Sequence, residues 1–338
     1  MSFLYFSYFS SISSMCDNSE RECVVSDSEN ILNPAQQEVI EHLGAPSKDR
    51  PSFETDLKQH LRRALETAVA HCMEELPNDE NIFLSKHRLT QIHGCEEKFL
   101  AEENEDFEWQ VATARGTIVH KAVELSVNWR KEIEPAVIVD EAVARFEEDS
   151  NSLGHWLRGC SEIERAELRS ISVDTFTKFL ECWPALKPSW RPVAESRVRA
   201  DLCNERLILA GKVDLTLGVA EGQKAGKVIV DFKTGGFNAT HHEDLRYYAL
   251  VETLRIGIPP RLVASYYLDQ GNFVPEKVTE ELLESTVRRI AKGVERIVEI
   301  THMEKPPILK PGPSCRWCLI SDDCDTGQKY INETDVNN

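Results

Sequence analysis

The sequence VIVDFKTGG at residues 228–236 decides the fold. Alternate residues of a β-strand point to the same face, so the two valines and the phenylalanine are predicted to pack together on one side. Asp231 and Lys233 then project together on the other side, and Gly235 and Gly236 end the strand. The stretch therefore predicts a strand that delivers a carboxylate and an ammonium group to the same place.

A second aspartate is predicted on the neighbouring strand. The motif GKVD at 211–214 places Asp214 away from that strand's apolar face. Carboxylate oxygens suit Mg²⁺, which can polarise a phosphodiester and acidify a water, while a lysine stabilises negative charge or orients that water. The pair of aspartates with Lys233 thus forms a sensible hydrolytic site. Taken alone, however, an Asp-x-Lys triplet is more often an ordinary surface pair at a strand end.

The rest of the chain is predicted to combine helices with one compact sheet. Period-2 patterns and turn residues predict strands at 192–200, 205–217, 226–233 and 261–268. Apolar spacing of three to four residues and capping signals predict helices at 52–76, 86–103, 113–130, 135–148, 161–182, 242–255 and 278–303. The expected regions are a flexible segment at 1–50, a helical region at 51–190, a core at 191–305 and a cysteine-bearing tail at 306–338, with 85–325 forming one domain.

Four motifs stand in a fixed order along the chain. They are GTIVH at 116–120, GKVD at 211–214, VIVDFKTGG at 228–236 and DLRYYAL at 244–250. Together they resemble the RecB-like branch of the PD-(D/E)XK nucleases over residues 90–325. The resemblance implies an α/β fold with a restriction-endonuclease-like core, in which helices flank a mixed central sheet. A helical N-terminal region and a cysteine-clamped C-terminal tail would complete the chain.

The resemblance also implies roles for individual residues. His120, Asp214 and Asp231 are the expected ligands of Mg²⁺ or Mn²⁺. The expected catalytic residues are Asp214, Asp231, Lys233, Glu195 and Tyr248. Glu124 lies one turn beyond His120 and is a candidate to orient it. A lone helical histidine is more often an ordinary core or surface residue, and a charged strand residue such as Glu195 is more often an exposed one.

One position departs from the family pattern. The helix motif usually begins with glutamine, whereas this chain has Asp244. An aspartate cannot donate a hydrogen bond unless it is protonated. The role of this position in placing Lys233 or DNA is therefore open.

The cysteines indicate a second metal centre. Cys315, Cys318 and Cys324 form a C-x₂-C-x₅-C pattern, and Cys95 can supply a distant fourth thiolate. The order resembles that of Cas4- and AddB-type nucleases, which implies a [4Fe–4S] cluster, with Zn²⁺ at the same four thiolates as the alternative. The six other cysteines are expected to be unligated thiols in a reducing, cytoplasmic compartment.

The charge balance limits how nucleic acid could bind. The formal net charge is −18, which argues against a protein that coats nucleic acid passively. A local basic groove is expected instead, with Arg197, Arg199, Lys212 and Arg246 as candidates. No apolar run of 18 residues occurs, so no membrane partner is expected, and Met15 is a candidate true start.

The expected function is therefore a metal-dependent DNA nuclease, an exonuclease acting on single strands or ends in repair or recombination. The alternative is an inactive iron–sulfur DNA-binding accessory of a helicase–nuclease or CRISPR adaptation complex. The chain has no G-x-x-x-x-G-K-[ST] motif, so a helicase partner would be a separate chain.

Overall fold

The computed structural model describes residues 32–103, 107–129, 132–238 and 240–336, and from Asn33 onward these residues belong to one compact unit. The expectations for a start at Met15 and for flexibility up to residue 31 lie outside the described residues. The segment expected to be flexible up to residue 50 already contains helix α1, Pro34–Leu43. Asn33 and Gln36 form its capping box, and the Asn33 side chain donates to the carbonyl of Glu181 at 2.7 Å. These bonds fix the segment from residue 33 onward.

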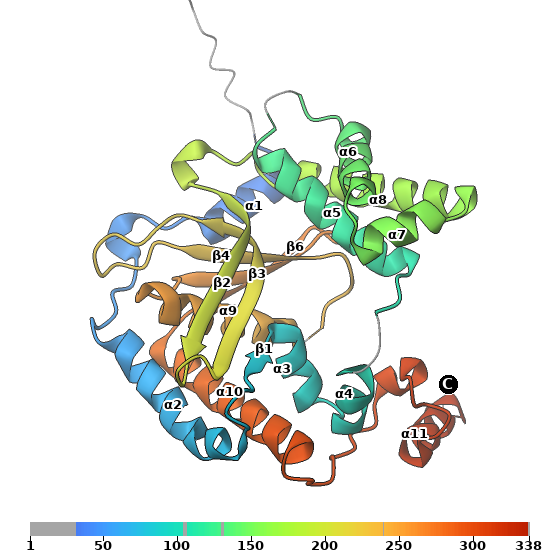
Figure 1. The fold of residues 1–338 in the computed structure, drawn as a ribbon. Helices are drawn as coiled ribbons and strands as arrows, with labels where there is room; N and C mark the ends of the chain where they lie inside the picture. The colour runs from blue at the N-terminus through green and yellow to red at the C-terminus, as the bar shows by residue number, and fades with distance from the viewer. Residues whose placement is uncertain (1–31, 104–106, 130–131, 239, 337–338) are drawn as a thin grey trace, which may run out of the picture. The chain divides into compact units, whose positions relative to one another are not determined.

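The centre of the molecule is a mixed sheet (Figure 1). Its strands are β1 (Ile82–Leu84), β2 (Val193–Leu202), β3 (Leu207–Leu217), β4 (Val228–Lys233), β5 (Leu262–Tyr267) and β6 (Asn272–Lys277). The order is β1-β3-β4-β5-β6, with β2 also paired to β3. The β1–β3 and β4–β5 pairs are parallel and the others antiparallel. The four predicted strands are confirmed, while β1 and β6 were not predicted.

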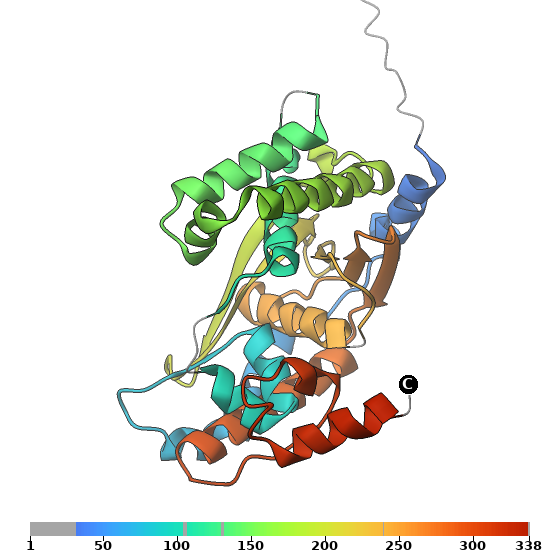
Figure 2. The ribbon, with the colours of Figure 1, turned by 90° about the vertical axis from the view of Figure 1, so that its right-hand side faces the viewer.

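Helices cover both faces of the sheet, which confirms the expected α/β class (Figure 2). One apolar cluster joins the sheet to α2 (Leu57–Glu75), α3 (Lys86–His93), α4 (Glu96–Glu103), α9 (Thr240–Ile256) and α10 (Glu280–Thr301). The second joins it to α1, α5 (Val111–Val127), α6 (Pro135–Glu148), α7 (Ser152–Gly159) and α8 (Glu162–Cys182). None of the described helices is both long and apolar enough to span a bilayer.

Strand β4 lies inside this sandwich and is buried on both faces, as central parallel strands usually are. Val228, Val230 and Phe232 belong to the second cluster, as the alternation predicts. Ile229 belongs to the first cluster. Asp231 and Lys233 share its face, so they emerge on the side of α3 and α9.

The cysteine-bearing C-terminal part contains regular structure. A short 3₁₀ helix spans Pro313–Trp317 and helix α11 spans Asp325–Val336. Figures 1 and 2 both show this part lying beside α4. The predicted helix at 86–103 is also divided, because Gly94 caps α3 with its backbone N–H and α4 begins at Glu96. The break places Cys95 in the turn between the two helices.

Candidate active site

Three carboxylates come from neighbouring positions on β2, β3 and β4, where the regular pairing of these strands is interrupted. The β2–β3 register, Ala194↔Leu215 and Ser196↔Val213, places Glu195 beside Asp214. The β3–β4 pairing runs to Leu215↔Val230, and the next position in that register joins Asp214 to Asp231. Here the side chain of Asp214 replaces a ladder bond, because its Oδ2 accepts from the backbone N–H of Phe232 at 2.7 Å. This bond orients Asp214 without occupying its other oxygen.

Glu195 reaches the site through an unusual backbone conformation. Its φ is +53° at the third residue of β2, a left-handed value that is costly for a residue with a side chain and that often marks a functional site. Its carboxylate forms an ion pair with Lys212. Burial raises the pKa of Glu195, although the bond from Lys212 opposes the rise.

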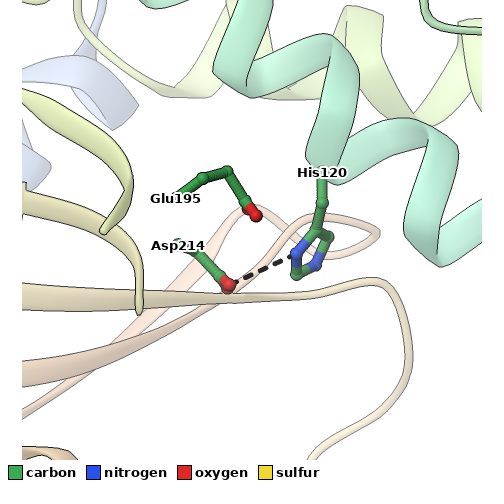
Figure 3. Close-up of side chains that lie close together, drawn as sticks. All are labelled: His120, Glu195 and Asp214. Carbon is green, nitrogen blue, oxygen red and sulfur yellow. Dashed lines mark ion pairs between the residues drawn. The ribbon is translucent and has the colours of Figure 1, made fainter. Parts of the chain in front are cut away.

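His120 completes a group of three potential metal ligands (Figure 3). Helix α5 can approach the end of β4 closely because Gly116 faces Thr234, whose Oγ1 would lie 3.1 Å from an added Cβ. His120 Nδ1 then lies 3.4 Å from Asp214 Oδ1. Ligand atoms of His120, Glu195 and Asp214 all lie within 4.8 Å of one another. Two carboxylates and one imidazole in this arrangement fit a divalent cation such as Mg²⁺ or Mn²⁺.

The protonation of His120 is coupled to its acidic neighbour. Burial lowers the pKa of the imidazole, but the charge of Asp214 and its hydrogen bond outweigh that effect and raise it. A bound cation would require the neutral imidazole, so metal binding would displace a proton from this position.

Asp231 stands apart from these three residues. Lys86 Nζ lies 2.7 Å from one of its oxygens and Lys233 Nζ lies 2.7 Å from the other. Burial alone would raise the pKa of Asp231, but the two ammonium groups lower it well below its usual range. The expected metal ligand is therefore held by two lysines in this structure.

Lys86 is the site residue that the motifs did not reveal. It is the first residue of α3, whose N-cap Ser85 accepts a hydrogen bond from the N–H of Arg88 at 3.2 Å. Asp244, the departure from the family pattern, lies between the two lysines. Its carboxylate is 3.3 Å from Lys233 Nζ and 3.9 Å from Lys86 Nζ. The only local signal for Lys86 is a lysine after a capping serine, which is too common to indicate a site.

Tyr248 has a supporting position. Its hydroxyl donates to the carbonyl of Lys212 at 2.6 Å, and burial raises its pKa to about 12. Gly211 leaves room for the ring, since an added Cβ there would lie 2.7 Å from Tyr248 Cε1. Lys86 Nζ lies over the same ring, 4.9 Å from its centroid. Tyr248 thus braces β3 and Lys86 and is poorly placed for proton transfer.

Two cavities meet at this site and share His120 and Thr234. One has a volume of about 580 Å³ and is lined by Lys86, Asp231, Lys233, Phe237 and His241, among others. The other has a volume of about 550 Å³ and is lined by Glu195, Asp214, Lys121 and Lys212, among others. Lysines therefore line both approaches to the carboxylates.

The predicted DNA-binding residues have varied surroundings. Arg199 pairs with Asp201 at 2.7 Å, Lys212 pairs with Glu195, and Arg246 pairs with Glu276 and Glu243. Arg197 is exposed on β2. Of these four, only Lys212 lines either cavity, the one that contains Glu195 and Asp214. Glu124, the candidate partner of His120, forms its ion pair with Lys121 at 2.8 Å.

The four predicted cluster ligands lie around one small pocket. Cys95, Cys315, Cys318 and Cys324 all line it, and all eight described cysteines are free thiols. Backbone N–H groups donate to two of the sulfurs, from Gly312 to Cys315 Sγ at 3.4 Å and from Gly327 to Cys324 Sγ at 3.3 Å. The fold thus brings the distant thiol of Cys95 to the C-terminal trio.

A buried ion pair holds the tail against α4. Arg296 donates to both oxygens of Glu96, which also accepts from the N–H of Ile308 at 2.8 Å. Burial raises the pKa of Glu96, but its bonds to Arg296 and Ile308 outweigh this and lower it. The ionised Glu96 therefore stabilises the fold fully at a pH above its pKa in the unfolded chain. This stabilisation is lost as the pH falls through the lower pKa that Glu96 has in the folded protein.

We expect Glu96→Gln to lower the free energy of unfolding by about 3 kcal/mol, because it removes one of the two carboxylates that pair with the largely buried Arg296 and leaves only Glu299. Denaturant titration measures this loss. Asp140→Asn is the control, since Asp140 pairs with Arg169 on the surface and should cost less than about 1 kcal/mol. Equal losses in the two variants would show that Glu96 does not anchor the tail.

Comparison with known proteins agrees with the motifs. Residues 84–325 match the family described as "PD-(D/E)XK nuclease superfamily". Among solved structures, the chain is similar to a "Putative exonuclease" from Eubacterium rectale, with 12% identity over 73% of this chain and 87% of that one and a TM-score of 0.42. It is also similar to SSO0001, with 11% identity over 80% and 97% and a TM-score of 0.32. These scores are too low for either structure to bear on the reaction. No curated protein matches the chain.

Proposed function

The chain belongs to the PD-(D/E)XK nuclease superfamily, and from this premise we propose that it is a metal-dependent DNA nuclease with its centre at His120, Glu195 and Asp214. The observation that carries the proposal is the convergence of these three side chains within 4.8 Å beside Asp231 and Lys233. Lysines line both adjoining cavities, which suits a polyanionic strand. The overall negative charge is then compatible with DNA, because lysines stand at the site itself, each of them beside a carboxylate that a bound cation would neutralise.

The chain's own residues have distinct parts in this reaction. When bound, a divalent cation polarises a phosphodiester and lowers the pKa of a water. Asp214 is held for this purpose by the N–H of Phe232, and Glu195 is held by Lys212. Lys233 would orient the attacking water or stabilise charge on the phosphate, with Asp231 and Asp244 fixing its ammonium group.

Phe237 supports single strands or frayed ends as substrates. It is 60% exposed, follows the paired glycines after β4, and lines the cavity that contains Asp231 and Lys233. Its ring lies 5.9 Å from that of Tyr267. An exposed aromatic ring in the same cavity as the cleavage site can stack on a base, and only an unstacked base offers a free face.

We therefore expect Phe237→Ala to raise KM for single-stranded DNA about tenfold, from a stacking energy of roughly 1–3 kcal/mol, with a smaller effect on kcat. Phe237→Trp should retain binding, and its fluorescence should be quenched by added single strands. Phe107→Ala is the matched control, because Phe107 is 62% exposed elsewhere on the surface. An unchanged KM in Phe237→Ala would remove the stacking role.

At the four cysteines we propose a [4Fe–4S] cluster. A single Zn²⁺ with Zn–S bonds of about 2.3 Å would hold the sulfurs about 3.8 Å apart. Among the described residues, only the His120 group has three ligand atoms that all lie within 4.8 Å of one another, so no three of these sulfurs lie that close together. A distant fourth thiolate and N–H donors to the thiolates are both typical of iron–sulfur sites.

The pathway is the broadest part of the proposal. The resemblance to RecB-like nucleases supports exonuclease action in DNA repair or recombination, with any helicase supplied by a separate chain.

The proposed activity is tested with protein purified without oxygen and end-labelled single- and double-stranded DNA. We expect cleavage with Mg²⁺ or Mn²⁺, none with EDTA, and severe loss in Asp231→Ala and Lys233→Ala. A folded wild-type protein that cleaves neither substrate with either ion would instead favour the DNA-binding accessory. Equal cleavage by wild type and Asp231→Ala would place the active site elsewhere.

A further inference from the structure

We propose that Lys86 is a displaceable counterion of Asp231: its ammonium group competes with the metal for that carboxylate and moves toward Asp244 when the metal binds. The proposal deepens the proposed function and rests on it, because it concerns how the same site accepts its cation. It assigns a positioning role to a residue outside the sequence motifs and gives a reason for the aspartate at position 244.

The competition follows from the contacts of Asp231. Asp231 is 1% exposed. One of its carboxylate oxygens lies 2.7 Å from Lys86 Nζ and the other lies 2.7 Å from Lys233 Nζ. A buried carboxylate that faces two ammonium groups has little negative charge left for a divalent cation. For Asp231 to join Asp214 as a ligand, one of the two lysines must withdraw.

Lys86 is better placed to withdraw than Lys233. It has a second acceptor, Asp244 Oδ2, at 3.9 Å, and it lies over the face of Tyr248 at 4.9 Å. A short movement would therefore exchange one carboxylate for another while the cation–π contact remains available. Lys233 is already 3.3 Å from Asp244, so it gains less by moving.

The two lysines and two aspartates at this position neutralise one another only when all four are present. Lys86, Lys233, Asp231 and Asp244 together carry two positive and two negative charges. A neutral glutamine at position 244 would leave two lysines with one aspartate, and burial of that excess charge is costly. Asp244 and Lys86 thus form a matched pair, and Asp244 is the place to which Lys86 retreats.

The test is Mn²⁺ affinity, measured by calorimetry on the intact protein in the absence of DNA. Lys86→Met should bind Mn²⁺ at least about tenfold more tightly. The repulsion between a unit positive charge and a nearby divalent ion is worth over about 1.4 kcal/mol even when it is screened as strongly as in water. Cleavage by Lys86→Met should nevertheless be slower, because Asp244 would have no Lys86 to pair with in the metal-bound state and would draw the ammonium group of Lys233 toward itself. Lys86→Arg should restore both properties toward wild type. Tighter metal binding together with slower turnover is a combination that a merely structural role would not produce.

The variant Asp244→Asn tests whether Asp244 affects Mn²⁺ affinity by accepting the displaced Lys86 or only through its own negative charge. Asp244→Asn should weaken Mn²⁺ binding, because Lys86 then has no second carboxylate to move to. In the double variant Lys86→Met/Asp244→Asn there is no Lys86 to move, so the Mn²⁺ affinity should equal that of Lys86→Met. Additive effects of the two substitutions would overturn the idea that Asp244 acts through Lys86.

The matched control is Lys227→Met at the opposite end of β4. Lys227 pairs with Glu252, which is 1% exposed, so this variant also removes a buried lysine–carboxylate pair. It should be less stable than wild type but should show no gain in Mn²⁺ affinity. Unchanged or weaker Mn²⁺ binding by folded Lys86→Met would overturn the proposal. This readout is independent of cleavage, so an inactive wild type would refute the nuclease and leave the counterion test intact.

Discussion

Asp214→Asn is expected to reduce DNA cleavage by at least about 10³-fold, because the loss of one metal-binding carboxylate removes several kcal/mol of transition-state stabilisation. Asparagine has nearly the same shape and retains an oxygen that can accept from the N–H of Phe232, the bond that orients Asp214 in the structure. The fold should therefore survive, with a melting temperature close to that of wild type. Steady-state cleavage of end-labelled single strands at saturating Mn²⁺ measures the effect.

The control for Asp214→Asn is Asp201→Asn. Asp201 lies on β2 and pairs with Arg199 at the surface, so its loss should leave cleavage unchanged. Calorimetry on the same samples should show weakened Mn²⁺ binding in Asp214→Asn alone. If Asp214→Asn binds Mn²⁺ and cleaves as wild type does, Asp214 is not a ligand.

Cys318→Ser is expected to have the second largest effect, the loss of the cluster and of the tail's attachment. The proposed cluster would join Cys95 to Cys315, which are 220 residues apart in the sequence. A cross-link that closes so long a loop stabilises a chain by about 5 kcal/mol in the chain-entropy model. The variant should lose iron and sulfide, and it should unfold at a distinctly lower denaturant concentration.

Cys203→Ser is the matched control, because Cys203 is half-buried in the turn after β2 and does not line the cysteine pocket. It should retain iron, sulfide and the brown colour that the proposed cluster would give the wild-type protein. Zinc without iron or sulfide in wild type would exclude the cluster while leaving the nuclease centre untouched. Retention of the cluster in Cys318→Ser would show that Cys318 is not a ligand.

Local patterns predicted much of the fold. The alternation in β4 is unambiguous because paired glycines follow it, and the structure places Val228, Val230 and Phe232 in one cluster as predicted. Strand β1 escaped prediction because three residues are too few to show a period, and its central Phe83 is 47% exposed. Strand β6 was hidden by Pro275, which is tolerated there because β6 is an edge strand.

Only those site residues that belong to a sequence motif could be predicted. His120, Asp214 and Asp231 stand in recognisable motifs, and the sheet register places Glu195 beside Asp214. Lys86 stands 145 residues before Asp231, and the packing of α3 against α9 brings the two together. Likewise, the ion pairs of Lys212 and Arg246 with glutamates could not be read from local sequence. Such contacts depend on the tertiary arrangement of elements and leave no local pattern.

The position of a bound cation tests the account most directly. In a crystal of the protein soaked with Mn²⁺, the anomalous scattering map should show a peak between His120, Glu195 and Asp214, with metal–oxygen distances of about 2.1 Å, typical of a small hard cation. Asp231 should then have moved toward the ion, with Lys86 displaced toward Asp244. A protein that cleaves DNA with Mn²⁺ but shows no peak there, or shows its peak elsewhere, would contradict the account.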